Sequence, residues 1–224
     1  MSASACLVVA KAPVPGQVKT RLASTVGDDV AAALAAASLL DTLDVCRDTF
    51  DRCILALSGD LGEAVAGDEI RRALEDWTVL AQRGTGLAAR LEHAHVDAYA
   101  VCRVPIVQVG MDTPHVSRAE LKRVATPLER GSADAVLGPA RDGGWWALGL
   151  AHPRWTAGLG SVEMSSSRTG EVTRALLRGN GARLRIADTL RDIDDATDAD
   201  ALRSRIASTR FGRAWRELAT AARP

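Results

Sequence analysis

The fold is set by the stretch Cys6-Leu7-Val8-Val9-Ala10, which runs directly into Lys11-Ala12-Pro13-Val14-Pro15-Gly16-Gln17-Val18-Lys19-Thr20-Arg21. The apolar run predicts a buried strand. In the segment that follows, the prolines fix φ and remove backbone donors, and Gly16 allows a turn or a close approach to a ligand. Lys11, Lys19 and Arg21 supply positive charge, and an arginine can hold a phosphate through two parallel hydrogen bonds. A strand that ends in a stiff cationic loop therefore predicts a site for a polyphosphate.

The same loop is open to two other interpretations. Proline and glycine with solvated cations also form ordinary surface turns, and the loop alone does not exclude that reading. A P-loop needs a second glycine directly before the lysine, and Val18 stands there. The sequence therefore excludes a Walker-type phosphate loop.

The composition suits one soluble α/β domain over residues 1–224. Hydrophobic residues make up 47% of the chain, and Lys plus Arg and Asp plus Glu number 28 each. A nucleic-acid-binding protein normally has a basic excess, so we expect no nucleic-acid partner. The sequence shows no signal-peptide core and no apolar stretch of membrane-span length, which predicts a cytoplasmic protein. The four cysteines include no Cys-x-x-Cys pair that would indicate zinc.

Short apolar runs alternate with longer amphipathic ones. This alternation predicts a three-layer α/β/α Rossmann-like sandwich with a mostly parallel mixed sheet, and ligands at the carboxyl ends of its strands. The expected strands are Cys6–Ala10, Cys53–Leu57, Thr78–Ala81, Pro105–Val109, Ala133–Gly138, Trp145–Leu150 and the weaker Arg183–Ile186. The expected helices are Asp28–Thr49, Glu63–Trp77, Leu87–Ala100, Ser117–Thr126, Glu171–Leu177 and a last one from Asp198 onward, broken near Phe211-Gly212.

Asp112 is the first candidate metal ligand. It lies in Gly110-Met111-Asp112-Thr113-Pro114, just after an expected central strand. The next helix already has its own capping box, Ser117 with Glu120, so Asp112 is not needed as a cap. A carboxylate at such a strand end suits Mg²⁺, which takes one or two carboxylates together with phosphates and water.

A glycine-rich segment, Gly138-Pro139-Ala140-Arg141-Asp142-Gly143-Gly144-Trp145-Trp146, joins two expected strands. It is read either as a simple hairpin turn or as a place where backbone N–H groups approach a substrate. Consecutive residues of a strand face opposite sides, so only one of the two tryptophans can face the core. The other is expected to line a substrate site.

Acidic residues cluster near the end of the chain, from Asp192 to Asp200. Thr197 and Asp200 are expected to cap the last helix, and Asp198 suits its positive end. Asp192, Asp194 and Asp195 have no such explanation, and their repulsion calls for a cation or for screening by water. A second metal ligand is therefore expected here.

Two weaker signals remain. Gly84 and Gly86 lie in a turn that opens a helix, which favours contact with an anion or a base. The irregular segment of residues 150–170 is read either as a functional loop or as an exposed linker.

These segments, in this order, resemble the bacterial DUF2064 family, also called transferase family 1 associated with radical-SAM/selenodomain proteins. The resemblance rests on four stretches: Ala10–Leu22, Gly110–Pro114, Gly138–Gly144 and Asp192–Asp194. The family looks like nucleotide-diphospho-sugar transferases with a GT-A, Rossmann-like fold. It is similar to small nucleotidyltransferases of the molybdenum-cofactor and phospholactate guanylyltransferase types.

The resemblance implies roles for individual residues. Lys19 and Arg21 would hold the nucleotide phosphates, Asp112 would bind Mg²⁺ or Mn²⁺, and Asp194 or Asp192 would complete the metal site. The expected catalytic residues are Lys19, Arg21 and Asp112. The expected nucleotide-binding residues are Lys11, Pro15, Gly16, Lys19, Arg21, Gly84 and Gly86. The expected substrate residues are Asp142, Gly143, Gly144 and Trp145.

Two departures from the family pattern leave the acceptor open. Trp145 stands where tyrosine is usual, and Glu163–Ser167 differs from the tryptophan-containing segment expected there. The leading hypothesis is a Mg²⁺-dependent nucleotidyltransferase that joins an NTP to a small phosphorylated or sugar-like acceptor. The alternatives are a glycosyltransferase with a nucleotide-sugar donor and a non-catalytic nucleotide-binding module. The oligomeric state is open, a homodimer included.

Overall fold

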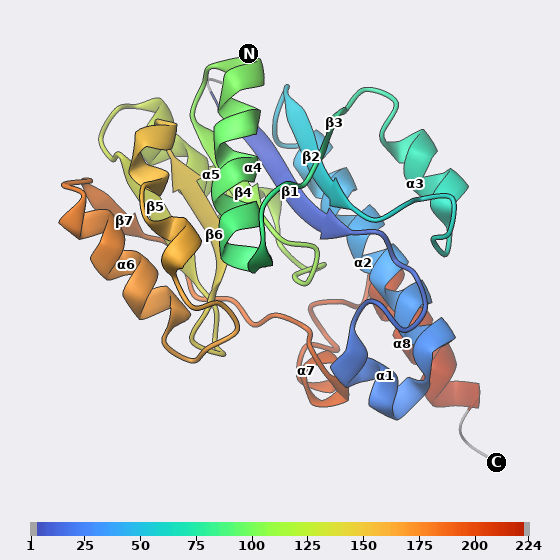
Figure 1. The fold of residues 1–224 in the computed structure, drawn as a ribbon. Helices are drawn as coiled ribbons and strands as arrows, with labels where there is room; N and C mark the ends of the chain where they lie inside the picture. The colour runs from blue at the N-terminus through green and yellow to red at the C-terminus, as the bar shows by residue number, and fades with distance from the viewer. Residues whose placement is uncertain (1–3, 222–224) are drawn as a thin grey trace.

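A computed structural model describes residues 4–221, which are organised around one seven-stranded sheet (Figure 1). The strands are β1 (Ala5–Lys11), β2 (Cys53–Ser58), β3 (Thr78–Ala81), β4 (Ile106–Val109), β5 (Ala135–Pro139), β6 (Trp145–Leu150) and β7 (Leu184–Ile186). They lie in the order β3-β2-β1-β4-β6-β5-β7. Strand β6 is antiparallel to both of its neighbours, and the other pairs are parallel. The mostly parallel mixed sheet predicted from the sequence is confirmed.

Helices cover both faces of the sheet. They are α1 (Thr20–Val26), α2 (Asp28–Arg47), α3 (Gly67–Ala73), α4 (Gly86–Cys102), α5 (Arg118–Glu129), α6 (Thr169–Gly179), α7 (Ala196–Ala201) and α8 (Arg210–Ala221), with short 3₁₀ turns η1 (Pro153–Thr156) and η2 (Leu159–Ser161). Figure 1 shows α4 and α6 on one face and α2 and α5 on the other. The three-layer sandwich is the result.

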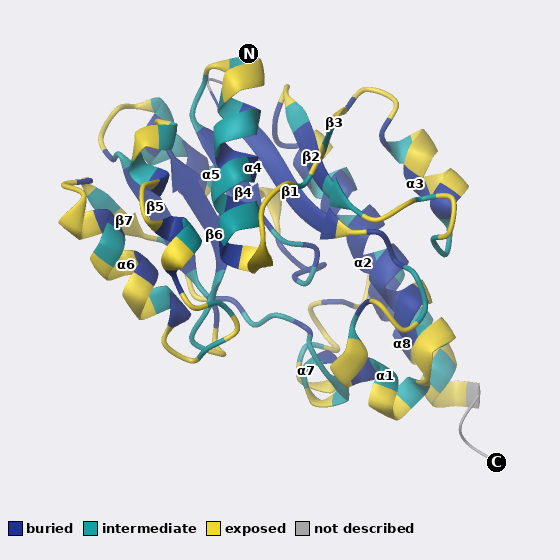
Figure 2. Cartoon of the chain, in the orientation of Figure 1, coloured by how far each residue is buried: buried dark blue, intermediate teal, exposed yellow. Residues whose placement is uncertain are grey.

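The sequence of β1 explains why both faces are covered. Alternate side chains of a strand point to opposite faces. Cys6, Val8 and Ala10 join the apolar core beneath α2 and α5, while Leu7 and Val9 join the core beneath α4. A strand buried on both sides carries a continuous apolar run, and Figure 2 shows the centre of the sheet as buried.

A third apolar cluster lies beyond the carboxyl ends of the strands. Leu22 of α1, Leu34 of α2, Ile193, and Phe211 of α8 are all buried in it. Helix α8 packs along α2, so the end of the chain is held against its beginning (Figure 1). This cluster fixes the loop after β1 and the acidic segment before α7 on one support.

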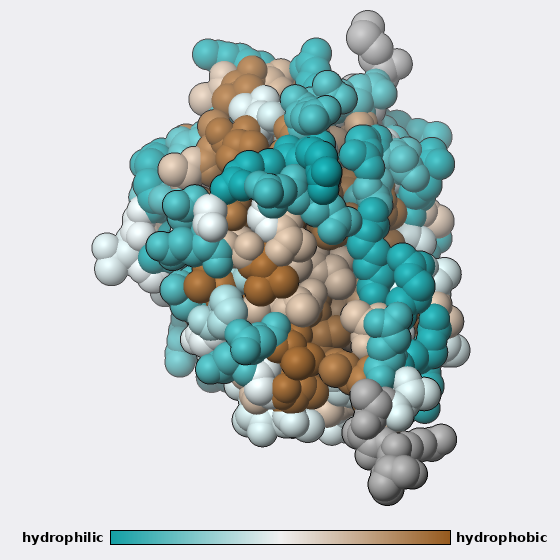
Figure 3. All heavy atoms as spheres, turned by 90° about the vertical axis from the view of Figure 1, so that its right-hand side faces the viewer, coloured by the Kyte–Doolittle hydropathy of each residue, from teal (hydrophilic) through white to brown (hydrophobic). Residues whose placement is uncertain are grey.

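Apolar residues reach the surface on the side where β3 forms the edge of the sheet. Figure 3 shows a band of apolar residues running down this side between hydrophilic margins.

Among residues 4–221, no helix combines the length and the apolar character that a membrane crossing requires.

The last helix differs from the expectation. The break predicted near Phe211-Gly212 is wrong, because both residues lie inside α8 and the interruption falls between α7 and α8, over residues 202–209. Phe211 is fully buried, and a Cβ on Gly212 would lie 1.8 Å from the carbonyl oxygen of Ile206. The glycine therefore allows the preceding turn to pack closely against α8, and it does not end a helix.

Two smaller differences concern local signals, and a third local prediction is confirmed. Helix α1 was not expected, and its start at Lys19 has no side-chain cap that a sequence could reveal. Helix α3 is shorter than expected and begins at Gly67, where a Cβ would lie 2.0 Å from the carbonyl oxygen of Leu61. The capping box at Ser117 and Glu120 is confirmed.

The prediction that Thr197 and Asp200 cap the helix here, α7, is wrong. Asp195, which had no assigned role, is the N-cap of α7 and forms a capping box with Asp198. Thr197 and Asp200 lie within the helix. One of the three unexplained acids is thus structural, which leaves Asp192 and Asp194.

The docking of α8 depends on Asp41 of α2. Its two carboxylate oxygens accept from the backbone N–H groups of Arg210 and Phe211, each at 2.9 Å. We expect Asp41→Ala to lower the free energy of unfolding by about 2 kcal/mol, because two helix-start donors lose their acceptor. The melting temperature would fall by about 4–8 °C.

The exposed Asp48, just past the end of α2, provides the control. Asp48→Ala should change the free energy of unfolding by less than about 0.5 kcal/mol. Equal effects of the two substitutions in urea denaturation would contradict the role given to Asp41.

Candidate active site

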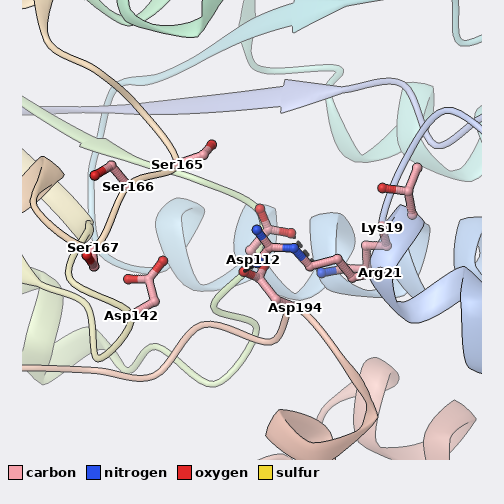
Figure 4. A pocket seen from close by; sticks show the side chains of 9 residues that line it. Lys19, Arg21, Asp112, Asp142, Ser165, Ser166, Ser167 and Asp194 are labelled. Carbon is pink, nitrogen blue, oxygen red and sulfur yellow. Dashed lines mark hydrogen bonds and ion pairs between the residues drawn. The ribbon is translucent and has the colours of Figure 1, made fainter.

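A cavity of about 340 Å³ opens where the loops after β1 and β4 meet the β5–β6 hairpin (Figure 4). The residues that line it are Lys19, Thr20, Arg21, Asp112, Asp142, Ser165, Ser166, Ser167 and Asp194. Figure 4 shows Lys19 and Arg21 reaching toward Asp112 and Asp194, with Asp142 and the serines on the opposite side. Strands β1, β4 and β5 run parallel, so their carboxyl ends share one edge, where ligands are expected in such sheets.

Lys19 is the most constrained residue of the site. Only 4% of its side chain is exposed. Its Nζ donates to Asp112 Oδ1 at 2.7 Å and to the carbonyl oxygen of Ile193 at 2.8 Å. Its backbone is left-handed, with φ 45° and ψ 45°, a conformation that residues with side chains seldom adopt unless their surroundings hold them there. The ammonium thus braces Asp112 and the acidic segment.

Arg21 is held far more loosely. Its Nη1 lies 3.0 Å from Asp194 Oδ2, and 68% of its side chain is exposed. An exposed ion pair of this kind contributes little to stability. The guanidinium is therefore available to exchange Asp194 for an anion in the cavity.

Main-chain and side-chain bonds join the loop after β4 to the acidic segment. The backbone N–H of Ile193 donates to the carbonyl oxygen of Asp112 at 2.9 Å. The hydroxyl of Thr113 donates to Asp192 Oδ1 at 2.9 Å. Asp112, Asp192 and Asp194 are therefore brought together although 80 residues separate the first from the second.

The raised pKa values of Asp192 and Asp194 reflect burial and an excess of negative charge at the site. Burial, and then the charges of Asp112, Asp142 and Asp194, raise the pKa of Asp192 to about 7, against the opposing hydrogen bond from Thr113. Burial and the charge of Asp112 also raise the pKa of Asp194, although Lys19 and Arg21 oppose this. The site favours the uptake of a proton or a cation.

The hairpin between β5 and β6 contacts the loop that carries Ser165, Ser166 and Ser167, called the serine loop below. The backbone N–H of Gly144 donates to Asp142 Oδ1 at 2.8 Å, and the N–H of Gly170 donates to the carbonyl oxygen of Gly143. Gly143 has φ +93°, and a Cβ there would lie 2.0 Å from the carbonyl oxygen of Ser167. The close approach that Gly143 permits is to the backbone of this loop.

A second cavity, of about 250 Å³, adjoins the first under the start of α4. Trp146 is buried and its Nε1 donates to the carbonyl oxygen of Asp188 at 2.9 Å. Trp145 is half-buried, and both indoles contribute to the wall of the cavity. The expectation that one tryptophan would face the core is confirmed.

Several predicted residues lie outside both cavities. Lys11, Pro15 and Gly16 belong to the loop after β1 but do not line either one. Gly84 and Gly86 do not line them either, although the neighbouring Leu87 does. A Cβ on Gly84 would lie 2.8 Å from Nδ1 of His93, so this glycine has a packing reason of its own.

Sequence reasoning missed Gln108 of β4 and Met164, which line the second cavity. The signal for Gln108 was present, because it is the one polar residue in the apolar run of residues 105–109.

The donor set fits a divalent cation of the Mg²⁺ or Mn²⁺ type. Asp112 and Asp194 present carboxylate oxygens to the cavity, and such hard donors suit these ions. Within residues 4–221 no three ligand side chains are already gathered around one point. Mg²⁺ commonly takes only one or two carboxylates and completes its shell with phosphates and water, so two carboxylates are sufficient.

The fold places the chain in the class of nucleotide-diphospho-sugar transferase folds. The chain is similar to a crystal structure from Desulfovibrio desulfuricans G20, provisionally assigned as a nucleotide-diphospho-sugar transferase. The two share 25% identity and superpose with a TM-score of 0.83 over 97% of this chain and 95% of that one. This likeness supports a transferase enzyme.

The chain belongs to the family described as an uncharacterized protein conserved in bacteria, DUF2064, whose model matches residues 39–166, more than half of the chain. The match includes Asp112 and the Gly138–Gly144 hairpin, and it excludes the loop after β1 and the acidic segment. Among curated proteins, none matches this chain by sequence.

More distant structures share the fold alone. A complex of Rv0371c with manganese, from Mycobacterium tuberculosis H37Rv, has 21% identity and a TM-score of 0.51 over 88% of this chain and 97% of that one. A cytidylyltransferase from Leptospira borgpetersenii serovar Hardjo-bovis has 13% identity and a TM-score of 0.55 over 92% of this chain and 87% of that one.

Lys19 and Arg21 should differ sharply in their effect on stability. Lys19→Met keeps the bulk of the side chain but leaves Asp112 and the Ile193 carbonyl without their buried donor. We expect it to lower the free energy of unfolding by about 2 kcal/mol. Arg21→Gln should change it by less than about 0.5 kcal/mol, because its ion pair is exposed. Urea denaturation of both variants gives the comparison, and similar losses would contradict the bracing role.

Asp192 should make stability depend on pH. Its pKa is raised in the folded state, so its stabilising contribution is complete below pH 4 and is lost as pH rises toward 7. Asp192→Asn cannot ionise and keeps an acceptor for Thr113. We expect the variant to exceed the wild type in melting temperature by a larger margin at pH 8 than at pH 5. A margin independent of pH would show that Asp192 ionises normally.

Proposed function

We propose that the protein is a divalent-metal-dependent nucleotidyltransferase, which joins an NTP to a small acceptor and releases pyrophosphate. One observation carries this proposal: Lys19 and Arg21 of the loop after β1 pair with Asp112 and Asp194 at the wall of a single cavity. Cations beside acidic oxygens at the carboxyl end of a parallel sheet suit a nucleotide with its metal.

Arg21 is the residue that binds the departing pyrophosphate in this mechanism. Its exposed guanidinium can leave Asp194 and hold phosphate oxygens through two parallel hydrogen bonds. Lys19 keeps Asp112 oriented and neutralises part of its charge. Asp112 and Asp194 would hold the divalent cation, which when bound neutralises charge on the phosphate oxygens.

The acceptor attacks the α-phosphorus in line with the departing pyrophosphate. The serine loop and the hairpin close the opposite side of the cavity and position the reactants. No protein nucleophile is required, because positioning and charge stabilisation account for catalysis of this kind. The fold shared with a cytidylyltransferase and with a manganese complex supports this reading.

A glycosyltransferase that takes a nucleotide sugar as donor is the second candidate. It is favoured by the assignment of the Desulfovibrio desulfuricans structure as a nucleotide-diphospho-sugar transferase. The loop after β1 favours the NTP, because a triphosphate carries more charge for the exposed Arg21 to balance than a nucleotide sugar does. A thermal-shift screen distinguishes the two donors, an NTP and a nucleotide sugar.

Thermal-shift screening identifies the donor without knowledge of the acceptor, because a ligand that binds the folded state raises the melting temperature. We expect one NTP with Mn²⁺ or Mg²⁺ to raise it more than nucleotide sugars do. Stabilisation by a nucleotide sugar alone would favour the glycosyltransferase.

Release of pyrophosphate from that NTP, in the presence of candidate acceptors, then tests the chemistry. Asp112→Asn should reduce turnover about a hundredfold or more, because a charge that stabilises the transition state is removed. Asp29→Asn, on an exposed turn of α2, should leave turnover unchanged. Binding of the NTP without any turnover would instead indicate a nucleotide-binding module, and undiminished turnover of Asp112→Asn would refute the metal assignment.

A further inference from the structure

Gln108 is the most unusual polar residue in the sheet. It lies in the middle of β4, between Val107 and Val109, and only 1% of it is exposed. Among the described residues, neither its Oε1 nor its Nε2 has a hydrogen-bond partner. The side chain lines the second cavity, beside Trp145 and Asp112. A complete carboxamide is therefore buried at the wall of a cavity without a hydrogen-bond partner from residues 4–221.

Folding alone does not explain this residue. A buried polar group without a partner destabilises a protein, whereas an apolar side chain of similar shape at the same place does not. Ile106, Val107 and Val109 show that the rest of the strand is apolar and buried. Gln82 provides the contrast, because its Nε2 donates to the carbonyl oxygens of Ala10 and Ala56 and so has a structural task.

The second cavity differs in chemistry from the first. Apolar side chains form much of its wall, among them Val9, Leu87, Leu91 and Met164. The charged residues in that wall are Asp112, Asp142, Asp192 and Asp194, and no Lys, Arg or His is among the described residues that line it. A phosphate group would meet four carboxylates there and no cation of the described residues. The indole Nε1 of Trp145 is a further buried donor without a partner among the described residues.

We propose that the second cavity binds an uncharged ring with apolar faces, and that Gln108 recognises a donor and an acceptor side by side on the edge of that ring. A carboxamide can donate and accept at the same time, which matches such an edge in one orientation. The apolar wall suits the faces of the ring, and a wall whose described residues carry four carboxylates and no cation disfavours a phosphate group. This inference rests on the proposed function in one respect, because that function puts a nucleotide in the adjoining first cavity.

Two molecules supply a ring of this chemistry: the base of the donor nucleotide and the organic part of the acceptor. In either case Gln108 sets specificity without touching the reacting phosphorus. The two sources differ in one measurable way, because only the first is displaced when a complete nucleotide binds.

The probes are the four ribonucleosides, which present ring edges but carry no phosphate. Binding to the wild type is measured by titration calorimetry and by ligand-observed NMR. We expect at least one nucleoside to bind, and its Kd to rise about tenfold or more in Gln108→Leu. The same variant should be as stable as the wild type or more stable, because it loses a buried amide that has no partner.

Gln82→Leu is the matched control. It should lower the melting temperature, because two carbonyl oxygens lose their donor, and leave nucleoside affinity unchanged. Gln108→Met, which is unbranched and apolar, gives the same comparison if the leucine variant does not fold. Displacement of the nucleoside by the matching NTP with Mn²⁺ assigns the cavity to the base, and binding alongside the NTP assigns it to the acceptor.

The proposal is overturned if no nucleoside binds the wild type, or if Gln108→Leu and Gln108→Met bind nucleosides as the wild type does. A marked loss of stability in Gln108→Leu with unchanged binding would show that the amide is structural. These measurements require no turnover. A protein that releases no pyrophosphate but loses nucleoside affinity in Gln108→Leu would refute the proposed function and keep this inference.

Discussion

The site depends on one ion pair, between the buried ammonium of Lys19 and the partly exposed carboxylate of Asp112. Through the second bond, to the carbonyl oxygen of Ile193, the same ammonium joins three parts of the chain that are far apart in sequence. The left-handed backbone of Lys19 persists because its side chain is held at its end by these partners. Because these two partners engage the ammonium of Lys19, the cation left exposed at the cavity is Arg21.

Because Lys19 is engaged and Arg21 alone is exposed, negative charge exceeds positive charge around the two cavities. Four carboxylates face the two cavities, and one of the two cations nearby is fully engaged. The protein can relieve the repulsion by taking up a proton, as the raised pKa of Asp192 indicates, or by binding a cation. Protons and divalent cations then compete for the same oxygens. Packing around Ile193 and Phe211 holds the acids together in spite of this repulsion, because the apolar cluster beneath them does not change with pH.

The parts of the molecule that could be predicted from sequence are those with local causes. The apolar runs define the strands, and Asp112 is conspicuous because it follows one of them without a capping role. The parts that could not be predicted depend on distant partners. Lys19 as a brace requires Ile193, the cap of α8 requires Asp41, and the reason for Gly143 is the carbonyl oxygen of Ser167. Asp195 could have been recognised as a cap, because Asp198 stands three residues later, but the neighbouring acids hid the pattern.

The two cavities share a wall, and this matters for the transfer reaction. Asp112, Asp142 and Asp194 line both of them, together with Ser165 and Ser166. In an in-line displacement the attacking group and the leaving group lie on opposite sides of the phosphorus, so a reaction centre at the shared wall would be approached from one cavity and left through the other. Arg21 belongs only to the first cavity and Gln108 only to the second. Under the proposed function, a polyphosphate would find its counter-charge at Arg21 in the first cavity. The second cavity, with no Lys, Arg or His among the described residues that line it, would suit an uncharged group.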